Sequence, residues 1–272
     1  TITLTPDAPA ALLEKKMVES GWGRIPVVDD SGRLIGIVTR TDLLKHWAEV
    51  HPGAGGTPID TGSTQTLSQA EITRVLGTPA ALIERIAAHA ASKGETVYMV
   101  GGVVRDILLE RRNLDLDFVV ESPHEGAAIH MAETLQARFG GKVTSFKPFG
   151  TAKWRIDQSV ADALNLPLET LPDHVDFAAA RSEFYEYPTA LPTTYAGGIK
   201  LDLARRDFSI NTLAVQLSAS SSIPPARPVK TESYPLIDEF GGVRDLREGV
   251  IRVLHSLSFI DDPTRILRAA RF

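Results

Sequence analysis

The chain has 272 residues and no cysteine, and its 29 basic and 34 acidic side chains give a formal net charge of −5. This length suits one sizeable domain and a smaller one. The lack of cysteine excludes a disulfide scaffold, a zinc–thiolate site, an iron–sulfur cluster and a cysteine nucleophile, and the acidic balance excludes a surface that is positively charged throughout. Because no apolar stretch is long enough to span a membrane and the first residues do not form a signal peptide, the sequence predicts a cytoplasmic protein with no membrane partner.

Residues 1–50 are expected to form a small α/β unit. Apolar residues at helical spacing predict a helix over residues 10–21. Two β-branched runs predict strands at 25–29 and 34–38, and a helix at 42–47 is expected to close the unit.

Residues 51–78 separate this unit from the rest of the chain. They are rich in Gly, Pro, Ser and Thr with little to pack, so they are interpreted as a linker. After them helices and strands are intermixed, which predicts an α+β fold with a mixed sheet. A proline-rich segment at 218–234 is expected to be a surface loop. The other expected elements are helices from 78, over 103–110, over 123–139, after 207 and after 263, and strands at 97–100, 114–120, 142–146, 151–156 and 174–178.

Gly101 and Gly102 lie between an expected strand and an expected helix, with Arg105 in the first turn of that helix. Because glycine has no Cβ, the backbone N–H groups of such a turn can approach a phosphate, and the helix N-terminus and the guanidinium add positive charge. A plain tight turn is the alternative, since a pair of glycines alone is a weak signal.

Asp115 and Asp117 lie two residues apart on an expected strand, so their carboxylates are expected to project from the same face. Their neighbours are apolar, and two adjacent carboxylates beside a core repel one another and need a neutralising partner. Mg²⁺ fits this requirement because it prefers oxygen ligands and accompanies substrate phosphates. A solvated strand end, where two aspartates cost little, is the alternative.

A glycine turn followed by a strand with paired aspartates resembles the polymerase-β-type nucleotidyltransferases. The resemblance implies a third acid on a neighbouring strand, and Asp176 is the candidate. The alternative for Asp176 is a salt bridge with Arg181.

Three later segments are similar to class II tRNA nucleotidyltransferases and bacterial poly(A) polymerases. Residues 201–214 resemble the arginine–aspartate motif of that family, residues 238–252 the loop and strand that follow it, and residues 261–272 its nucleobase-reading helix. Where the family usually has Glu, this sequence has Asp261.

From Pro79 to Phe272 these motifs occur in the order of the family. The resemblance implies a polymerase-β-like nucleotidyltransferase head domain at 79–253, followed by the start of a helical neck at 254–272. The family continues into neck, body and tail helices that hold tRNA, so the chain is expected to be a fragment.

The resemblance also implies a role for each motif residue. The implied catalytic acids are Asp115, Asp117 and Asp176, of which the first two would hold Mg²⁺. The implied nucleotide-binding residues are Gly101, Gly102, Arg105 and Arg206 for the triphosphate, Asp207 for the sugar, and Asp262 with Arg265 for the base.

Two of these groups have an ordinary structural alternative. Arg205, Arg206 and Asp207 are expected to open a helix, where Asp207 is a simple cap beside solvated arginines in the alternative interpretation. Asp262 and Arg265 lie three residues apart and share a helical face, where a carboxylate and a guanidinium can contact a base edge or form an intrahelical salt bridge.

Residues 23–44 resemble a single CBS motif. The resemblance implies that Thr39 and Asp42 hold the ribose of an adenine nucleotide, whereas in the alternative interpretation Thr39 only caps a helix. CBS motifs work in pairs, so a partner motif is expected upstream or in a second copy of the chain, which would make a homodimer.

Taken together, the resemblance implies a metal-dependent enzyme that adds AMP, with CMP left open, to the 3′ end of tRNA and releases pyrophosphate. ATP and CTP are the implied nucleotides. A poly(A) polymerase that acts on general RNA ends, and a catalytically inert CBS-type sensor of adenine nucleotides, are the alternatives.

The seven histidines show no metal-ligand spacing and are interpreted as surface or core residues. Trp154 and Phe149 are interpreted as core rather than as a base-stacking platform.

Overall fold

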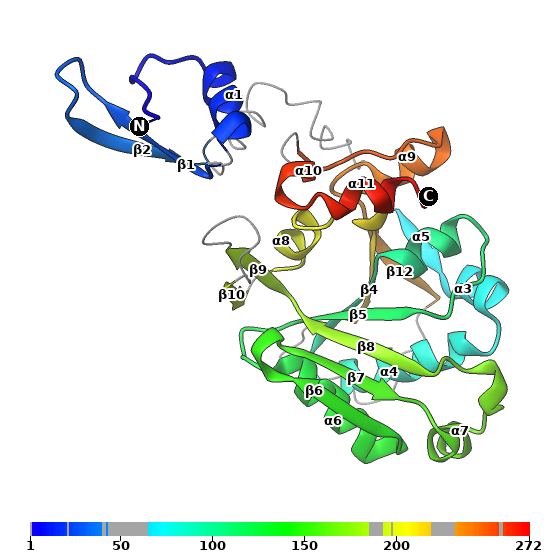
Figure 1. Ribbon diagram of the computed structural model, residues 1–272. Coiled ribbons are helices and arrows are strands. Elements are labelled where there is room, and N and C mark those ends of the chain that lie inside the picture. The colour runs from blue at the N-terminus through cyan, green and yellow to red at the C-terminus, as the bar shows by residue number, and fades with distance from the viewer. Residues whose placement is uncertain are drawn as a thin grey trace. The chain divides into compact units, whose positions relative to one another are not determined.

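A computed structural model describes residues 2–20, 22–39, 42, 65–184, 193–196, 198–218, 232–255 and 258–272 (Figure 1). The chain divides into two units, each described by itself. The first unit consists of Thr1–Ile59, Glu183–Thr193 and Val253–Phe272, and the second, called the head unit below, of Asp60–Ser182 and Thr194–Arg252. None of the helices in the described part of the chain is both long enough and apolar enough to cross a membrane.

The N-terminal segment of the first unit has the predicted helix and strands. Helix α1 (Ala10–Ser20) is followed by the antiparallel strands β1 (Arg24–Val28) and β2 (Leu34–Thr39). Its small core contains Met17 and Ile25, both at most 1% exposed. Apart from Asp42, the helix predicted at 42–47 lies outside the described residues. The C-terminal segment contains α10 (Ser258–Asp261) and α11 (Thr264–Ala269), the latter as predicted after Pro263.

The head unit contains an eight-stranded mixed sheet, which confirms the predicted fold class. Strands β5 and β8 pair in parallel, and the other neighbouring strands of this sheet pair antiparallel. The strand order is β3 (Thr66–Ser68), β12 (Ser233–Ile237), β11 (Ala214–Ser218), β4 (Thr96–Val100), β5 (Leu116–Glu121), β8 (His174–Ala179), β7 (Thr151–Arg155) and β6 (Lys142–Phe146). Strands β9 (Arg181–Phe184) and β10 (Thr193–Ala196) form a separate pair.

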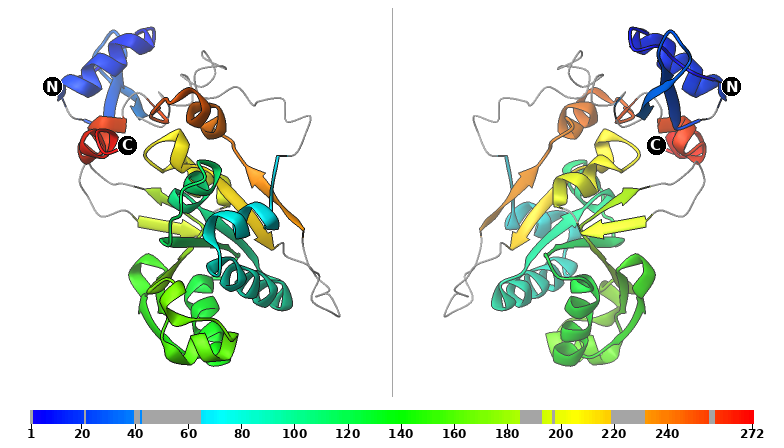
Figure 2. Two further views of the ribbon diagram at one scale, coloured as in Figure 1. Left: turned by 90° about the vertical axis from the view of Figure 1, so that its right-hand side faces the viewer. Right: turned by 90° about the vertical axis from the view of Figure 1, so that its left-hand side faces the viewer.

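One face of this sheet is covered by helices. Alternate residues of the strands, such as Phe118, Phe177 and the fully buried Trp154, point into a large apolar core, as the two-residue period of a strand requires. Helices α4 (Pro79–Lys93) and α6 (Ala127–Phe139) close this core, and Figure 2 shows them on the same side of the sheet. The remaining helices of the head unit are α3 (Gln69–Leu76), α5 (Gly102–Leu108), α7 (Gln158–Leu164), α8 (Ile199–Ala204) and α9 (Gly242–Glu248).

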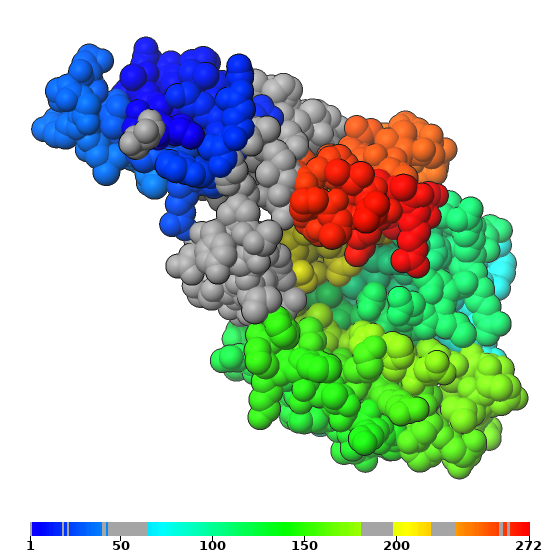
Figure 3. All heavy atoms as spheres, viewed as in Figure 1, coloured from blue at the N-terminus to red at the C-terminus, as the bar shows by residue number. Residues whose placement is uncertain are grey.

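The opposite face is covered over β4 and β5 but open over β6 and β7. Ile199 and Leu203 of α8 pack on Val100 and Val119, which leaves the strands beyond β5 without this cover. On β6 and β7 the side chains of this face are exposed or half-buried, and Figure 3 shows this region (green) at the surface. The open face is therefore where charged side chains of the sheet can meet a ligand.

Two predicted irregular segments contain regular structure. Residues 66–76 of the predicted linker form β3 and α3, because Ser68 and Glu71 make a reciprocal capping box and Ile72 is buried in the core. The predicted loop at 218–234 overlaps β11 at Ser218 and β12 at the buried Tyr234, and residues 219–231 lie outside the described part of the chain. Phe149 is 40% exposed, so its assignment to the core is wrong.

Candidate active site

A row of charged side chains crosses the open face of the sheet. Asp117 of β5 is the register partner of Asp176 on β8, and Asp176 is the register partner of Lys153 on β7. Register partners project from the same face, and the Lys153 Nζ lies 3.2 Å from the Asp176 carboxylate. Asp115 precedes β5 and is exposed, so the strand predicted from 114 begins later than expected, yet its charge still acts on Asp117.

The surroundings of Asp117 disfavour its ionised form. Burial first, and then the negative charges of Asp115 and Asp176, raise the pKa of Asp117 to about 6, although Arg206 and Lys153 oppose the increase. One ligand atom each from Asp115, His174 and Asp176 lies within 4.8 Å of the others. A carboxylate cluster of this kind fits a divalent cation, which supplies positive charge.

His174 belongs to this cluster, although the sequence analysis interpreted every histidine as a surface or core residue. Its Nε2 lies 3.2 Å from the Asp176 carboxylate, and it projects from β8 on the same face, two residues before Asp176. The period of a strand could have placed both residues together. Lys153 was missed because its partner lies on a neighbouring strand that the sequence alone does not specify.

Arg205 and Arg206 follow the last turn of α8, whereas the sequence analysis placed them at the start of a helix. The fully buried Asp202 accepts hydrogen bonds from Arg205 Nη2 at 2.6 Å and from Arg206 Nη2 at 3.2 Å. After the arginines the chain forms only the 3₁₀ turn Ser209–Asn211 before β11. Asp202 of the short α8 thus holds the guanidinium groups of Arg205 and Arg206 close to one another.

The glycine turn contacts one of these arginines. Gly101 has φ +71°, a backbone conformation that favours glycine, and a Cβ at this position would lie 2.7 Å from Arg206 Nη1 and would displace that guanidinium. Arg105 binds the Asp106 carboxylate with two hydrogen bonds of 2.8 and 3.0 Å and donates to Asn211 Oδ1 at 2.8 Å. The turn and the start of α5 (Gly102–Leu108) therefore support the arginine side of the site.

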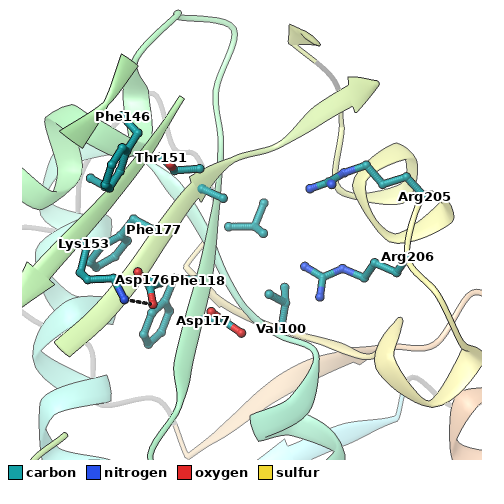
Figure 4. A pocket seen from close by; sticks show the side chains of 13 residues that line it. Val100, Asp117, Phe118, Phe146, Thr151, Lys153, Asp176, Phe177, Arg205 and Arg206 are labelled. Atoms are coloured by element: carbon teal, nitrogen blue, oxygen red, sulfur yellow. Dashed lines mark ion pairs between the residues drawn. The ribbon is translucent and has the colours of Figure 1, made fainter. Parts of the chain in front are cut away.

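A pocket of about 430 Å³ connects these groups. Figure 4 shows Arg205 and Arg206 on one side, Lys153 on the other, and Asp117 and Asp176 between them. The Arg206 Nε is buried without a hydrogen-bond partner in the structure. A ligand that carries several negative charges would match the arginine side, and a cation would match the acids.

Asp207 has a structural role that the sequence analysis gave as an alternative. One of its carboxylate oxygens accepts from the backbone N–H of Phe208 at 2.8 Å and from Asn211 Nδ2 at 3.0 Å, so Asp207 holds the chain on both sides of the 3₁₀ turn without being its N-cap.

Asp262 and Arg265, which the sequence analysis expected to contact the base, lie in the C-terminal segment of the first unit. Asp262 accepts hydrogen bonds from the backbone N–H and hydroxyl of Thr264, which lower its pKa. Arg265 donates to Ser258 Oγ, and its Nε lies 3.9 Å from Asp262. Asp262 lies between α10 and α11 and Arg265 lies in α11, so the two form a long ion pair at the start of α11 and not the expected pair within one helix.

Thr39 and Asp42 bind one another in the N-terminal segment. The Asp42 carboxylate accepts from the backbone N–H of Thr39 at 2.9 Å and from its hydroxyl at 2.7 Å, and the Asp42 N–H donates back to the hydroxyl. This reciprocal pattern is that of a capping box, which matches the structural alternative given for Thr39.

Comparisons with known proteins agree with these motifs. The family model of the poly A polymerase head domain matches residues 97–252, and a CBS domain model matches residues 1–49. The A-adding tRNA nucleotidyltransferase of Geobacter sulfurreducens is 39% identical over 98% of this chain, and that of Aquifex aeolicus is 41% identical over 99%. The chain spans 28% of the length of each of these two relatives.

Solved structures give the same family. An apo form of a CCA-adding enzyme is 39% identical, with a TM-score of 0.59, and the match covers 76% of this chain and 43% of that one. Other similar structures are complexes of CCA-adding enzymes with ATP, with CTP and, for the Thermotoga maritima enzyme, with tRNA. The acid row, the glycine turn and the arginines of α8 all lie within the matched head domain, and the chain belongs to the poly A polymerase head domain family.

Proposed function

We propose that this protein transfers AMP from ATP to the 3′-hydroxyl of tRNA and releases pyrophosphate. The observation that carries the proposal is a pocket in which Asp117 and Asp176 lie between a lysine and two arginines. The similarity of nearly the whole chain to A-adding enzymes supports AMP rather than CMP as the transferred group. The cytoplasmic location stays a prediction from the sequence.

Asp115 and Asp117, with Asp176 beside them, are proposed to hold Mg²⁺, and two of these three acids, Asp115 and Asp176, belong to the cluster of possible metal ligands. The raised pKa of Asp117, caused first by burial and then by the charge of Asp115, supports the proposal because a bound cation would stabilise the ionised carboxylate. When bound there, Mg²⁺ would lower the pKa of the attacking hydroxyl and neutralise charge on the phosphates. His174 completes the cluster and holds Asp176 in place through the 3.2 Å contact.

The arginine side of the pocket binds the triphosphate. Arg206, anchored by Asp202 and seated over Gly101, directs its guanidinium toward the pocket, and Gly102 keeps the turn open. The 3′-oxygen of the RNA forms a bond to the α-phosphorus while the bond from that phosphorus to the bridging oxygen breaks, and the released pyrophosphate carries the negative charge that the arginines offset.

Arg105 and Asp207 already make hydrogen bonds within the protein, unlike the Nε of Arg206. Both side chains hold the 3₁₀ turn through Asn211, so they position the arginine side of the pocket. Their proposed contacts with the triphosphate and the sugar would be made in addition to these bonds.

Asp262 and Arg265 are proposed to select the base. Changing Arg265 to Ala is expected to admit wrong nucleotides with roughly ten- to a hundredfold higher relative efficiency, because a bidentate base contact gives about 1–3 kcal/mol of discrimination. The measurement is kcat/KM for all four nucleotides. An equal loss for all four would assign Arg265 to phosphate binding or to folding.

The CBS segment is proposed to pair with a second CBS motif, which would give a homodimer in the absence of an upstream partner. Strand β2 leaves Leu34, Ile35 and Ile37 between 48% and 65% exposed, an apolar surface that such a partner would cover. Light scattering of this chain should then show a dimer, and a monomer at high concentration contradicts the proposal. If an adenine nucleotide binds at Thr39 and Asp42, its ribose hydroxyls would have to replace the hydrogen bonds that Thr39 now donates to the Asp42 carboxylate.

One experiment tests the proposed function. The complete natural protein is incubated with Mg²⁺, each nucleotide separately, and tRNAs that end before, within or after the CC sequence. A-addition only to tRNA that ends in CC is expected. Addition of C as well would identify a CCA-adding activity, repeated A-addition to unrelated RNA a poly(A) polymerase, and no transfer at all an inert sensor.

A further inference from the structure

The β6–β7 hairpin combines basic and aromatic side chains at the edge of the pocket. Residues 142–155 contain four basic residues and no acidic one, in a protein whose net charge is −5. Phe146, at the end of β6, is 50% exposed and lines the pocket. The other large aromatic residues of this part of the sheet, Phe118, Phe177 and Trp154, lie in the core on the covered face, so the exposure of Phe146 indicates a different role.

The register places these side chains on the open face. Phe146 is opposite Thr151, and Lys142 is opposite Arg155, so the same face also carries Lys153. Two like charges directly opposite one another on neighbouring strands are destabilising, and Asp157, at the start of α7, offsets only part of the Arg155 charge. The Lys142–Arg155 pair therefore favours an anion on this face.

The geometry of phosphoryl transfer decides which ligand approaches this side. The attacking and leaving oxygens lie roughly in line on opposite sides of the reacting phosphorus. The arginines that offset the pyrophosphate lie on one side of Asp117 and Asp176, and Phe146 lies on the other (Figure 4). The RNA that carries the attacking hydroxyl consequently enters from the Phe146 side.

We propose that Phe146 stacks on the terminal base of the RNA 3′ end, and that Lys142 and Arg155 bind the phosphates of the preceding nucleotides. Aromatic side chains within a basic groove are the usual platform for single-stranded nucleic acid. This inference rests on the proposed function and adds to it the path of the RNA strand. It also assigns to Phe146 the stacking role that the sequence analysis considered only for Phe149 and Trp154.

Kinetics of the complete protein test the stacking contact. Phe146→Leu keeps an apolar side chain but removes the ring, and it is expected to raise the KM for tRNA roughly tenfold while the KM for ATP stays within about twofold. Phe149→Leu is the matched control, because Phe149 is 40% exposed on the same hairpin but does not line the pocket. It should leave both constants unchanged.

A tRNA whose terminal nucleotide lacks its base separates stacking from a structural effect. With this RNA, wild type and Phe146→Leu should have the same KM, because neither protein can stack on a missing base. A tenfold difference that persists, an equal effect of Phe149→Leu, or a rise in the KM for ATP instead would each overturn the inference. If wild-type protein transfers no nucleotide to tRNA, the proposed function itself fails, and that failure is visible before any variant is compared.

The phosphate contacts have an independent test. In tRNA binding measured against salt concentration, Lys142→Gln should reduce the slope of log K against log salt by about 0.7, the value for one phosphate of a single strand that is no longer neutralised. Lys93→Gln, at the end of α4, is the control and should leave the slope unchanged. Equal slopes for wild type and Lys142→Gln would remove Lys142 from the RNA path.

Discussion

Two fully buried aspartates, Asp202 and Asp245, each hold two arginines, but only one of the two clusters belongs to the pocket. Asp245 accepts a hydrogen bond from Ser209 Oγ at 2.5 Å and from Arg252 Nε at 2.9 Å, and Arg244 lies 3.4 Å away. Burial acts to raise the pKa of Asp245, but the bonds from Arg252 and Ser209 outweigh burial and lower it.

The difference between the clusters lies in where the arginines point. Those of Asp245 do not line the pocket, and Asp245 itself joins α9 to Arg252 of the following chain and to Ser209 of the 3₁₀ turn. Those of Asp202 also line the pocket, where the Nε of Arg206 is buried without a hydrogen-bond partner. Buried ion pairs of the same composition can thus stabilise the fold or present charge to a ligand, and the cavity distinguishes them.

The largest expected effect is on the pocket side of this comparison. The double change Asp115→Ala and Asp117→Ala should reduce nucleotide transfer below detection, because it removes the proposed Mg²⁺ ligands. The measurement is AMP transfer to tRNA, with circular dichroism to show that the fold is retained. Transfer that survives this double change would remove both acids from the catalytic site.

A change at Asp245 should act on stability instead. Asp245→Asn leaves the buried hydroxyl of Ser209 and the partly exposed guanidinium of Arg252 with a weaker acceptor, and we expect the free energy of unfolding to fall by about 2–3 kcal/mol. Urea unfolding measures this loss. The rate of AMP transfer by the folded variant should stay within about twofold of the wild-type rate. A loss of activity without a loss of stability would show that Asp245 belongs to the site, like Asp202.

Arg206→Gln should weaken nucleotide binding and leave the stability nearly unchanged. A lost hydrogen bond between charged groups costs about 1.5–3 kcal/mol, so the KM should rise about ten- to a hundredfold for every nucleotide, while stability changes little because Asp202 keeps Arg205. Steady-state kinetics with ATP and CTP test the expectation. A change in the ranking of the nucleotides would show that Arg206 contacts the base.

The smallest expected effect concerns the pH dependence of stability. Because the pKa of Asp117 is about 6 in the folded protein and 3.8 for an unperturbed aspartate, the folded state keeps a proton that the unfolded state has released between these pH values. The free energy of unfolding should fall by about 1–2 kcal/mol as the pH rises through this window, after allowance for partial exposure.

Asp117→Asn should remove this decrease and leave the metal-free protein more stable than wild type above pH 6. Urea unfolding at pH 4 and pH 7 without divalent cations gives the comparison. Parallel curves for the two proteins would show that Asp117 ionises normally and that the acids of the pocket are fully compensated.

The local sequence predicted much of this structure. The pattern of apolar residues around Asp117 predicted a buried strand there, and the glycine pair predicted the turn at Gly101 between a strand and a helix. The strands β5 to β8 agree with the predicted ranges within a few residues. These features depend on residues that are close in the chain, where periodicity and turn chemistry are informative.

The rest depends on which strands become neighbours. His174 and Lys153 join the acids only because β8 inserts between β5 and β7, and no local pattern specifies that order. The short α8 was missed because its six residues are too few for a clear helical period. Arg205 and Arg206 were therefore placed at the start of a helix, although they follow its end.

The parallel pairing of β5 with β8 also has a consequence for folding. Hairpin β6–β7 and the antiparallel pair β7–β8 involve segments close in sequence, but Asp117 meets Asp176 only when β8 docks against the much earlier strand β5. Contacts of such long sequence separation form late because of their loop-closure entropy. In a chain whose β8 has not yet docked, Asp117 and Asp176 therefore remain apart, and the row of acids forms only when the sheet is completed.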